Sequence, residues 1–265
     1  MTDWLTINRG QAPLIVSIPH AGIDVPDDIA DALQGLPLAR HDADHHVDRL
    51  YAFATELSAT MLHTAISRTV IDVNRDPSGQ SLYPGQTTTG LCPTTCFDGT
   101  LLYKPGREPD APEIERRRGL YFDPYHDALT EEIARLRKLH PAVVVYDAHS
   151  IRSHVPRLFD GDLALFNIGS FDGKSCSPDL TSATELACSG NTCVVNGRFK
   201  GGWITRHFGD PMNGIHAIQM ELAMRGYLDE KGDWPPKWDS SGAAPLQSTL
   251  RKILSACLTF AKDAS

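Results

Sequence analysis

The sequence lacks the features that mark membrane, secreted and nucleic-acid-binding proteins. It has no run of about 18 apolar residues, so we expect no transmembrane helix. Its start, MTDWLTINRG, does not combine a basic segment with an apolar core, and so does not resemble a secretory signal. The net charge of −8 argues against binding to nucleic acid. Together these absences predict a cytoplasmic protein.

Cysteine is scarce as well, because six cysteines scattered among 265 residues do not make a disulfide framework. Cys92 and Cys96 lie four positions apart, but no second close pair completes a four-cysteine zinc site. The G-x-S-x-G motif of serine hydrolases is absent, and no cysteine stands in a clearly basic, reactive setting. The phosphate-loop order G-x-x-x-x-G-K-[ST] is also missing. A serine or cysteine hydrolase and a phosphate-loop protein are therefore disfavoured.

Apolar segments of two kinds alternate along the chain. Short apolar runs typical of buried strands occupy residues 13–18, 69–73, 142–147, 163–168, 192–195 and 215–222. Helices are expected over 47–61 and 246–261, from Asp110, and from Asp123, with Pro124 breaking or kinking the chain between the last two. This alternation predicts an α/β fold with a mixed, largely parallel central sheet flanked by helices. No Pro/Gly/Ser linker divides the chain, so residues 1–265 are expected to form one domain.

One of these strands ends on polar residues. In VVVYDAHSI, residues 143–151, Asp147 and His149 lie two positions apart and therefore share a face of the strand. Open α/β sheets tend to bind ligands at the carboxyl ends of their strands. A solvated strand end would explain the pair, but so would a metal bound by His149 and oriented through Asp147.

Two further groups of polar residues favour the metal. His20 directly follows the first predicted strand, in SIPHAG, although a lone histidine there would normally be a surface turn residue. The segment RHDADHHVDRLY, residues 40–51, holds three acids and three histidines before a helix, and helix capping explains only one or two of the acids. Two histidines and one carboxylate, with a fourth position left open, form a common catalytic zinc set.

The last predicted strand and several arginines complete the candidate site. On an alternating strand Ala217, Gln219 and Glu221 share one face, so Glu221 is either a solvated residue or the general base of a metal site. Arginines that follow predicted strands can hold carboxylates with two parallel hydrogen bonds, which favours a small anionic substrate. These arginines are Arg68, Arg75, Arg152, Arg157, Arg198 and Arg206.

Seven segments, in this order, resemble the N-formylglutamate amidohydrolase family over residues 13–228. They are SIPHAG, SRTVIDVNRDP, LYPGQTTTGLCP, YDAHSIRS, PRLFDG, NGRFKGGWITRHFGDP and HAIQMEL. The resemblance implies a fold similar to that of zinc carboxypeptidases and aspartoacylases. It also implies hydrolysis of N-formyl-L-glutamate to formate and L-glutamate, in histidine degradation.

The resemblance further implies roles for individual residues. The metal ligands would be His20, His149 and a carboxylate from the 40–51 segment, for which we choose Asp44 while Asp42, His46 and Asp48 stay open. Glu221 would activate the water and pass its proton to the leaving amine. Asn74 and Arg75 would hold one substrate carboxylate, and Arg152 and Arg198 the second. The expected metal is Zn²⁺, although cobalt, iron or manganese would also suit these ligands.

Two alternatives remain at this stage. One is a related zinc hydrolase with another substrate, such as an acyl-amino-acid deacylase or a carboxypeptidase, because loop residues set the substrate. The other is a non-catalytic binding protein on the same scaffold, which would need a broken metal set or a missing base. The presence of His20, His149 and Glu221 weighs against this second alternative.

Overall fold

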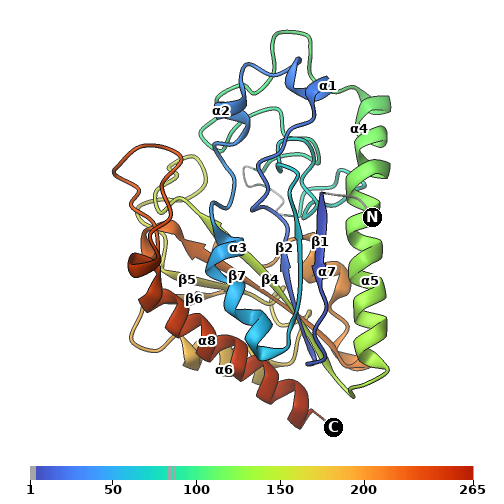
Figure 1. Cartoon of the computed structure of the whole chain (residues 1–265), viewed down its shortest axis with the longest axis vertical. Helices are drawn as coiled ribbons and strands as arrows, with labels where there is room; N and C mark the ends of the chain where they lie inside the picture. The colour runs from blue at the N-terminus through green and yellow to red at the C-terminus, as the bar shows by residue number, and fades with distance from the viewer. Residues whose placement is uncertain (1–3, 83–84, 86–87, 265) are drawn as a thin grey trace.

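Seven strands form one sheet in the order β1-β3-β2-β4-β7-β5-β6 in the computed structural model, which describes residues 4–82, 85 and 88–264 (Figure 1). In chain order the strands are β1 (Leu5–Asn8), β2 (Leu14–Ile18), β3 (Thr60–Thr64), β4 (Val143–Ile151), β5 (Phe166–Gly169), β6 (Cys193–Val195) and β7 (Ile215–Ala223). The central strands β3, β2, β4 and β7 run parallel, whereas β1 and β5 run antiparallel to their central neighbours. The prediction of a mixed sheet flanked by helices is confirmed.

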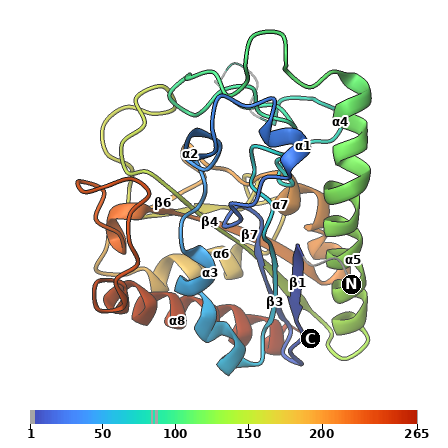
Figure 2. The same ribbon diagram turned by 45° about the horizontal axis from the view of Figure 1, so that its top comes forward.

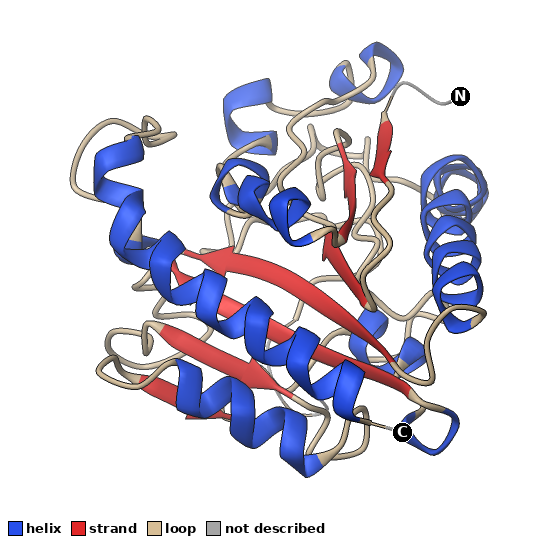
Figure 3. Cartoon of the chain, turned by 60° about the horizontal axis from the view of Figure 1, so that its bottom comes forward, coloured by secondary structure: helices blue, strands red, loops and turns tan. Residues whose placement is uncertain are grey.

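Helices cover both faces of this sheet. The α-helices are α1 (Asp27–Ala30), α2 (Leu36–Ala39), α3 (Val47–Leu50), α4 (Ala111–Arg117), α5 (Asp123–Arg137), α6 (Pro178–Ala187), α7 (Trp203–Phe208) and α8 (Ser240–Asp263). Short 3₁₀ segments are η1 (Ala52–Leu57), η3 (Pro211–Asn213) and η4 (Met224–Gly226), and η2 (Arg118–Phe122) is a π-helical turn. Figures 2 and 3 show α8 and α6 side by side on one face, with α5 on the other. None of the helices in the described ranges is long and apolar enough to cross a membrane.

The strand residues divide between two cores according to their position in the strand. Val16, Tyr146 and Met220 belong to the core under α3, α6 and α8, which includes Leu250. The intervening residues belong to the core under α5 and α7, and among these are Ile15, Val145 and Ala217. Because both faces of the central strands are buried, those strands are apolar throughout instead of alternating with polar residues.

The long helical column along one side differs from its prediction at Pro124. Asp110 caps α4 as expected, because its side chain accepts a hydrogen bond from the Glu113 N–H at 3.0 Å. Pro124 lies in the first turn of α5, where a missing N–H costs little, and the π turn η2 joins α4 to α5 (Figure 1). α5 begins at Asp123 as predicted, but no break separates it from α4, because the two helices run on from one another through η2.

Two predicted elements were wrong in extent or type. The helix over 47–61 ends early, because α3 passes into η1 and Ser58 then adopts the left-handed conformation, so that Met61 lies in β3. Residues 69–73 form turns and no strand, although Val70, Ile71 and Val73 pack into the core under α5. Their apolar character reflects this packing and not strand pairing. Part of the segment LYPGQTTTGLCP, namely residues 83, 84, 86 and 87, lies outside the described residues.

A buried histidine on α5 supports the turn that precedes Asn74. The Nε2–H of His126 donates a 2.8 Å hydrogen bond to the Val73 carbonyl oxygen, and burial lowers the pKa of His126 to about 4 despite this bond. The unfolded chain binds the same proton with a pKa of about 6.5. Between about pH 6.5 and pH 4 the unfolded chain binds more protons than the folded protein. The free energy of unfolding should therefore decrease as the pH is lowered through this range, by up to about 1.4 kcal/mol per pH unit. His126→Gln, which keeps a donor, should flatten this dependence in urea unfolding curves; an unchanged slope would contradict the assignment.

Candidate active site

Polar side chains from three neighbouring strands meet at the carboxyl edge of the parallel part of the sheet. His20 lies two residues beyond the end of β2, and His149 and Glu221 lie near the ends of β4 and β7. The parallel register places His149 directly opposite Glu221, and Asp147 opposite Gln219. The four strand residues, which are Asp147, His149, Gln219 and Glu221, are buried. Their side chains project on the side of α7, as the two-residue period predicted.

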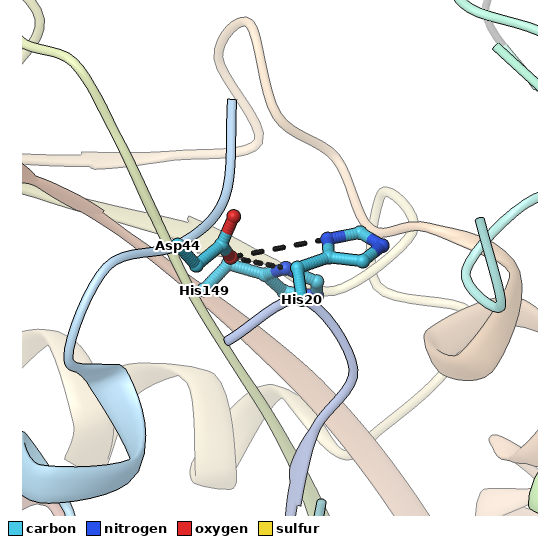
Figure 4. Close-up of side chains that lie close together, drawn as sticks. All are labelled: His20, Asp44 and His149. Carbon is cyan, nitrogen blue, oxygen red and sulfur yellow. Dashed lines mark hydrogen bonds and ion pairs between the residues drawn. The ribbon is translucent and has the colours of Figure 1, made fainter. Parts of the chain in front are cut away.

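His20, Asp44 and His149 converge on one point (Figure 4). Their ligand atoms all lie within 4.8 Å of one another. The Asp44 Oδ2 lies 3.1 Å from Nδ1 of His149 and 3.8 Å from Nδ1 of His20. Each histidine therefore turns the same ring nitrogen, Nδ1, toward the shared carboxylate.

The other nitrogen of each ring faces a second carboxylate. Nε2 of His20 lies 2.7 Å from Asp72, and Nε2 of His149 lies 3.1 Å from Asp147. At His20 this carboxylate holds a proton on Nε2, so that Nδ1 offers its lone pair, as a metal bound there requires. Nε2 of His149 also lies 2.8 Å from the amide nitrogen of Asn74.

The structure brings Asp44 into this cluster and places the other candidates of the 40–51 segment elsewhere. The Asp44 N–H donates to the His20 carbonyl oxygen at 2.9 Å, and Asp44 Oδ2 accepts from the Ser150 N–H at 3.0 Å. Asp42 is held by Arg152, and His46 donates to the Pro236 carbonyl oxygen. Asp48 lies on α3.

The three residues fit a divalent metal. Among the described residues, Nδ1 of His20 is a buried atom without a hydrogen-bond partner, and a metal would satisfy it. Burial lowers the pKa of His149, but Asp147 and Asp44 outweigh burial and raise it well above its usual value. Burial also lowers the pKa of His20, helped by Arg68. Two nitrogens and one carboxylate oxygen suit zinc and related transition metals.

A second group of possible ligands, His41, Asp42 and Cys96, is less suitable. Asp42 already accepts hydrogen bonds from Arg152 and from the Phe97 N–H. Burial also raises the pKa of the Cys96 thiol to about 12, which disfavours the thiolate that binds metals.

Asp72 links a metal ligand to the arginines of the site. It is fully buried and pairs with His20 at 2.7 Å, Arg68 at 2.7 Å and Arg75 at 3.2 Å. Burial alone would raise the pKa of Asp72, but these partners hold it well below its usual value. Asp72 was predicted to lie inside a strand, and the sequence indicated no role for it.

Replacing Asp72 should weaken metal binding although Asp72 does not touch the metal position. We expect Asp72→Asn to lower the affinity for Zn²⁺ by roughly 10- to 100-fold, because His20 loses the carboxylate that fixes its tautomer. Competition with a chelating dye measures this. Asp76→Asn, in the same loop but outside the cluster, is the control and should bind Zn²⁺ like the wild type. Equal affinities for both variants would contradict the role of Asp72.

Glu221 lies beside the cluster and forms no ion pair with any residue in the described part of the chain. Its Oε2 accepts a hydrogen bond from Gln219 Nε2 at 3.3 Å, and the Gln219 Oε1 accepts from the Gly202 N–H at 2.7 Å. Burial raises the pKa of Glu221 to about 8, and Asp44 adds to this while His149 opposes it. A buried carboxyl group that binds a proton near neutral pH is suited to general acid–base chemistry.

Asn74 lines the site, but its amide is engaged. Nδ2 donates to Asp147 at 2.8 Å and Oδ1 accepts from the Ile204 N–H at 2.7 Å. Gly202 makes room for it, since a Cβ there would lie 2.5 Å from Asn74 Nδ2. Asn74 therefore holds Asp147, which faces His149.

Four arginines line the cavity above these residues, and Glu221 is the one carboxylic acid among the described lining residues. The cavity has an inner volume of about 70 Å³. It is lined by His20, Arg68, Asn74, Arg75, Thr88, Thr89, Phe97, His149, Ile151, Arg157, Leu158, Arg198, Phe199, Gly202, Gln219 and Glu221. Arg75 and Arg198 lie here as predicted. Arg152 does not: it pairs with Asp42 at 3.2 Å and lies over the Trp234 ring.

Comparison with known proteins agrees with this geometry. The family model of N-formylglutamate amidohydrolase matches residues 12–228. The chain belongs to the N-formylglutamate amidohydrolase family. It is 42% identical to N-formylglutamate deformylase of Pseudomonas putida, covering 99% of this chain and 98% of the relative. It is 41% identical to N-formylglutamate deformylase of Pseudomonas aeruginosa, covering 99% of each.

Two solved structures share the fold of this chain. N-formylglutamate amidohydrolase from Ralstonia eutropha superposes with a TM-score of 0.78 at 25% identity, over 97% of both chains. A gene product from Agrobacterium tumefaciens superposes with a TM-score of 0.73 at 17% identity, over 98% of this chain and 95% of the other. The second likeness shows the fold alone.

Proposed function

We propose that this amidohydrolase hydrolyses N-formyl-L-glutamate to formate and L-glutamate at a divalent metal held by His20, Asp44 and His149. One observation carries the proposal: three potential metal ligands converge, and two of them line an arginine-rich cavity together with the buried Glu221. The names of the Pseudomonas relatives point to the same substrate. From the family resemblance we further propose zinc as the metal, a sheet of the zinc-carboxypeptidase type, a cytoplasmic location and a role in histidine degradation.

The metal, when bound, would supply a Lewis acid for the formyl oxygen and lower the pKa of a water toward about 7. Glu221 takes a proton from the attacking water as the new C–O bond forms. It then gives this proton to the amide nitrogen as the C–N bond breaks, so that formate and the free amine of glutamate leave. Gln219 orients the Glu221 carboxyl group for both transfers.

The arginines bind the two carboxylates of the substrate. The α-carboxylate lies two bonds from the scissile amide nitrogen, and must therefore stay close to the metal ligands. Arg75 is the cation suited to it, because Arg75 pairs with Asp72, which pairs with His20. Arg198 is assigned to the second carboxylate. Asn74 is assigned to holding Asp147, since its amide atoms are already hydrogen-bonded.

Hydrolysis of a panel of acylated amino acids, followed as release of the free amine, tests the proposal. The metal-loaded protein should hydrolyse N-formyl-L-glutamate and should act on N-acetyl-L-glutamate at least about 100-fold less efficiently, because the additional methyl group crowds a small cavity. Equal kcat/KM values would contradict a formyl-specific site. Preference for an N-acetyl or peptide substrate would instead identify a related deacylase or a carboxypeptidase.

A further inference from the structure

The arginines that line the cavity differ in how their charge is balanced. The inner pair, Arg68 and Arg75, bind the buried carboxylate of Asp72 at 2.7 and 3.2 Å, and Arg68 also lies 3.5 Å from Asp44. These two guanidinium groups therefore offset buried negative charge beside the metal ligands. Arg68 has two carboxylate partners, whereas Arg75 has one and can also bind the α-carboxylate of the substrate.

Arg157 is different. Among the described residues no carboxylate oxygen lies within 4.0 Å of its guanidinium nitrogens, yet it lines the same cavity as Glu221. Its Nη1 donates to the Cys96 carbonyl oxygen at 3.3 Å. The guanidinium also lies against Gly99, where a Cβ would be 3.6 Å from Cζ. The group is thus held by the backbone while its charge remains available to an anion.

The position of Arg157 places it on the outer side of the cavity. Arg157 is exposed, whereas Arg68 is buried and stacks on the ring of Phe97 at 4.8 Å. Arg198 lies near Arg157, because its Nε–H donates to the carbonyl oxygen of Leu158 at 2.8 Å. Both guanidinium groups belong to residues that line the same cavity.

We propose that Arg157, together with Arg198, binds the side-chain carboxylate of the substrate and that Arg157 determines the preference for a dicarboxylic formyl-amino acid. The inference rests on the proposed function. When the α-carboxylate lies beside Arg75, the two methylene groups of the glutamyl side chain carry the second carboxylate away from the metal ligands. A second cation is then required on the outer side, where Arg157 supplies a planar pair of donors that matches a carboxylate.

The experiment compares two substrates of nearly the same shape, N-formyl-L-glutamate and N-formyl-L-glutamine. The variants are Arg157→Met and Arg157→Lys, with Arg107→Met as a control that removes an exposed charge away from the cavity. For Arg157→Met the ratio of kcat/KM for formylglutamate to that for formylglutamine should fall roughly 10- to 100-fold, mainly through KM. The ratio for Arg157→Lys should lie between those of the wild type and Arg157→Met. Arg107→Met should keep the wild-type ratio.

Each outcome separates the inference from the proposed function. A wild type that releases formate, together with an Arg157→Met variant that keeps the full substrate ratio, would overturn the role of Arg157 alone. An equal loss with both substrates would also overturn it, since that result indicates a structural role. A metal-loaded wild type without activity on formylglutamate would overturn the proposed function and this inference with it.

Discussion

Glu221→Gln is expected to lower kcat for formate release by roughly 10²- to 10⁴-fold while leaving the metal content unchanged. Gln has nearly the shape of Glu and can still accept the hydrogen bond from Gln219, but it cannot take a proton from water. Because Glu221 does not belong to the convergent ligand set, its replacement should leave metal binding intact. Metal analysis and a coupled formate assay on the same sample measure both quantities.

A matched control tests whether removing any buried carboxylate would lower kcat. Glu132 is buried on α5 and pairs with Arg9 and Arg135, away from the cavity. Glu132→Gln should keep the wild-type kcat in a folded sample. A Glu221→Gln variant with more than about a tenth of wild-type kcat would exclude Glu221 as the general base, since such a base contributes at least about 100-fold.

Asp44→Asn should cause the largest loss of metal affinity, beyond the roughly 10- to 100-fold expected for a residue that only orients a ligand. Asn keeps an oxygen that can accept from the Ser150 N–H, so the loop should stay in place. It removes the negative charge shared by His20 and His149. Activity should fall at low zinc and partly return as zinc is added in excess.

The neighbouring aspartate gives the control for this prediction. Asp42→Asn changes a carboxylate two positions away that is bound by Arg152, outside the ligand cluster. It should bind zinc with wild-type affinity. If instead Asp42→Asn loses zinc and Asp44→Asn keeps it, the third ligand has been assigned to the wrong residue of the 40–51 segment.

The two-residue period of a strand was sufficient to predict that the side chains of Asp147 and His149 lie next to one another. The two-residue repeat of a strand places them on one face, and the structure shows their side chains 3.1 Å apart. The same rule placed Glu221 and Gln219 together on β7. The strand β4 itself continues to Ile151, so the pair lies within the strand and not beyond its end.

Contacts between distant segments could not be derived in this way. Asp44 reaches His149 through a hydrogen bond to Ser150, which is 106 residues away, and no local pattern distinguishes it from Asp42 or Asp48. The role of Asp72 was missed for a related reason. Its apolar neighbours suggested a strand, whereas they pack as turns against α5. Short strands β1 and β3 and helices α6 and α7 also lack a strong periodic signal and were not predicted.

The arginines show how far composition can lead. Basic residues after strands indicated an anionic substrate, and four arginines do line the cavity. The sequence could not show that Arg152 turns away to pair with Asp42, or that Arg157 stands in the cavity instead. The direction in which an arginine side chain points depends on the residues that it contacts in the folded protein. The sequence motif does not identify these contacts.

The central claim is tested most directly by titrating zinc into metal-stripped wild-type protein while following formate release from N-formyl-L-glutamate. The stripped protein should be nearly inactive, and activity should rise with zinc and level off at one ion per chain, as expected for the ligand set His20, Asp44 and His149. Full activity in protein shown to be free of metal would contradict the account.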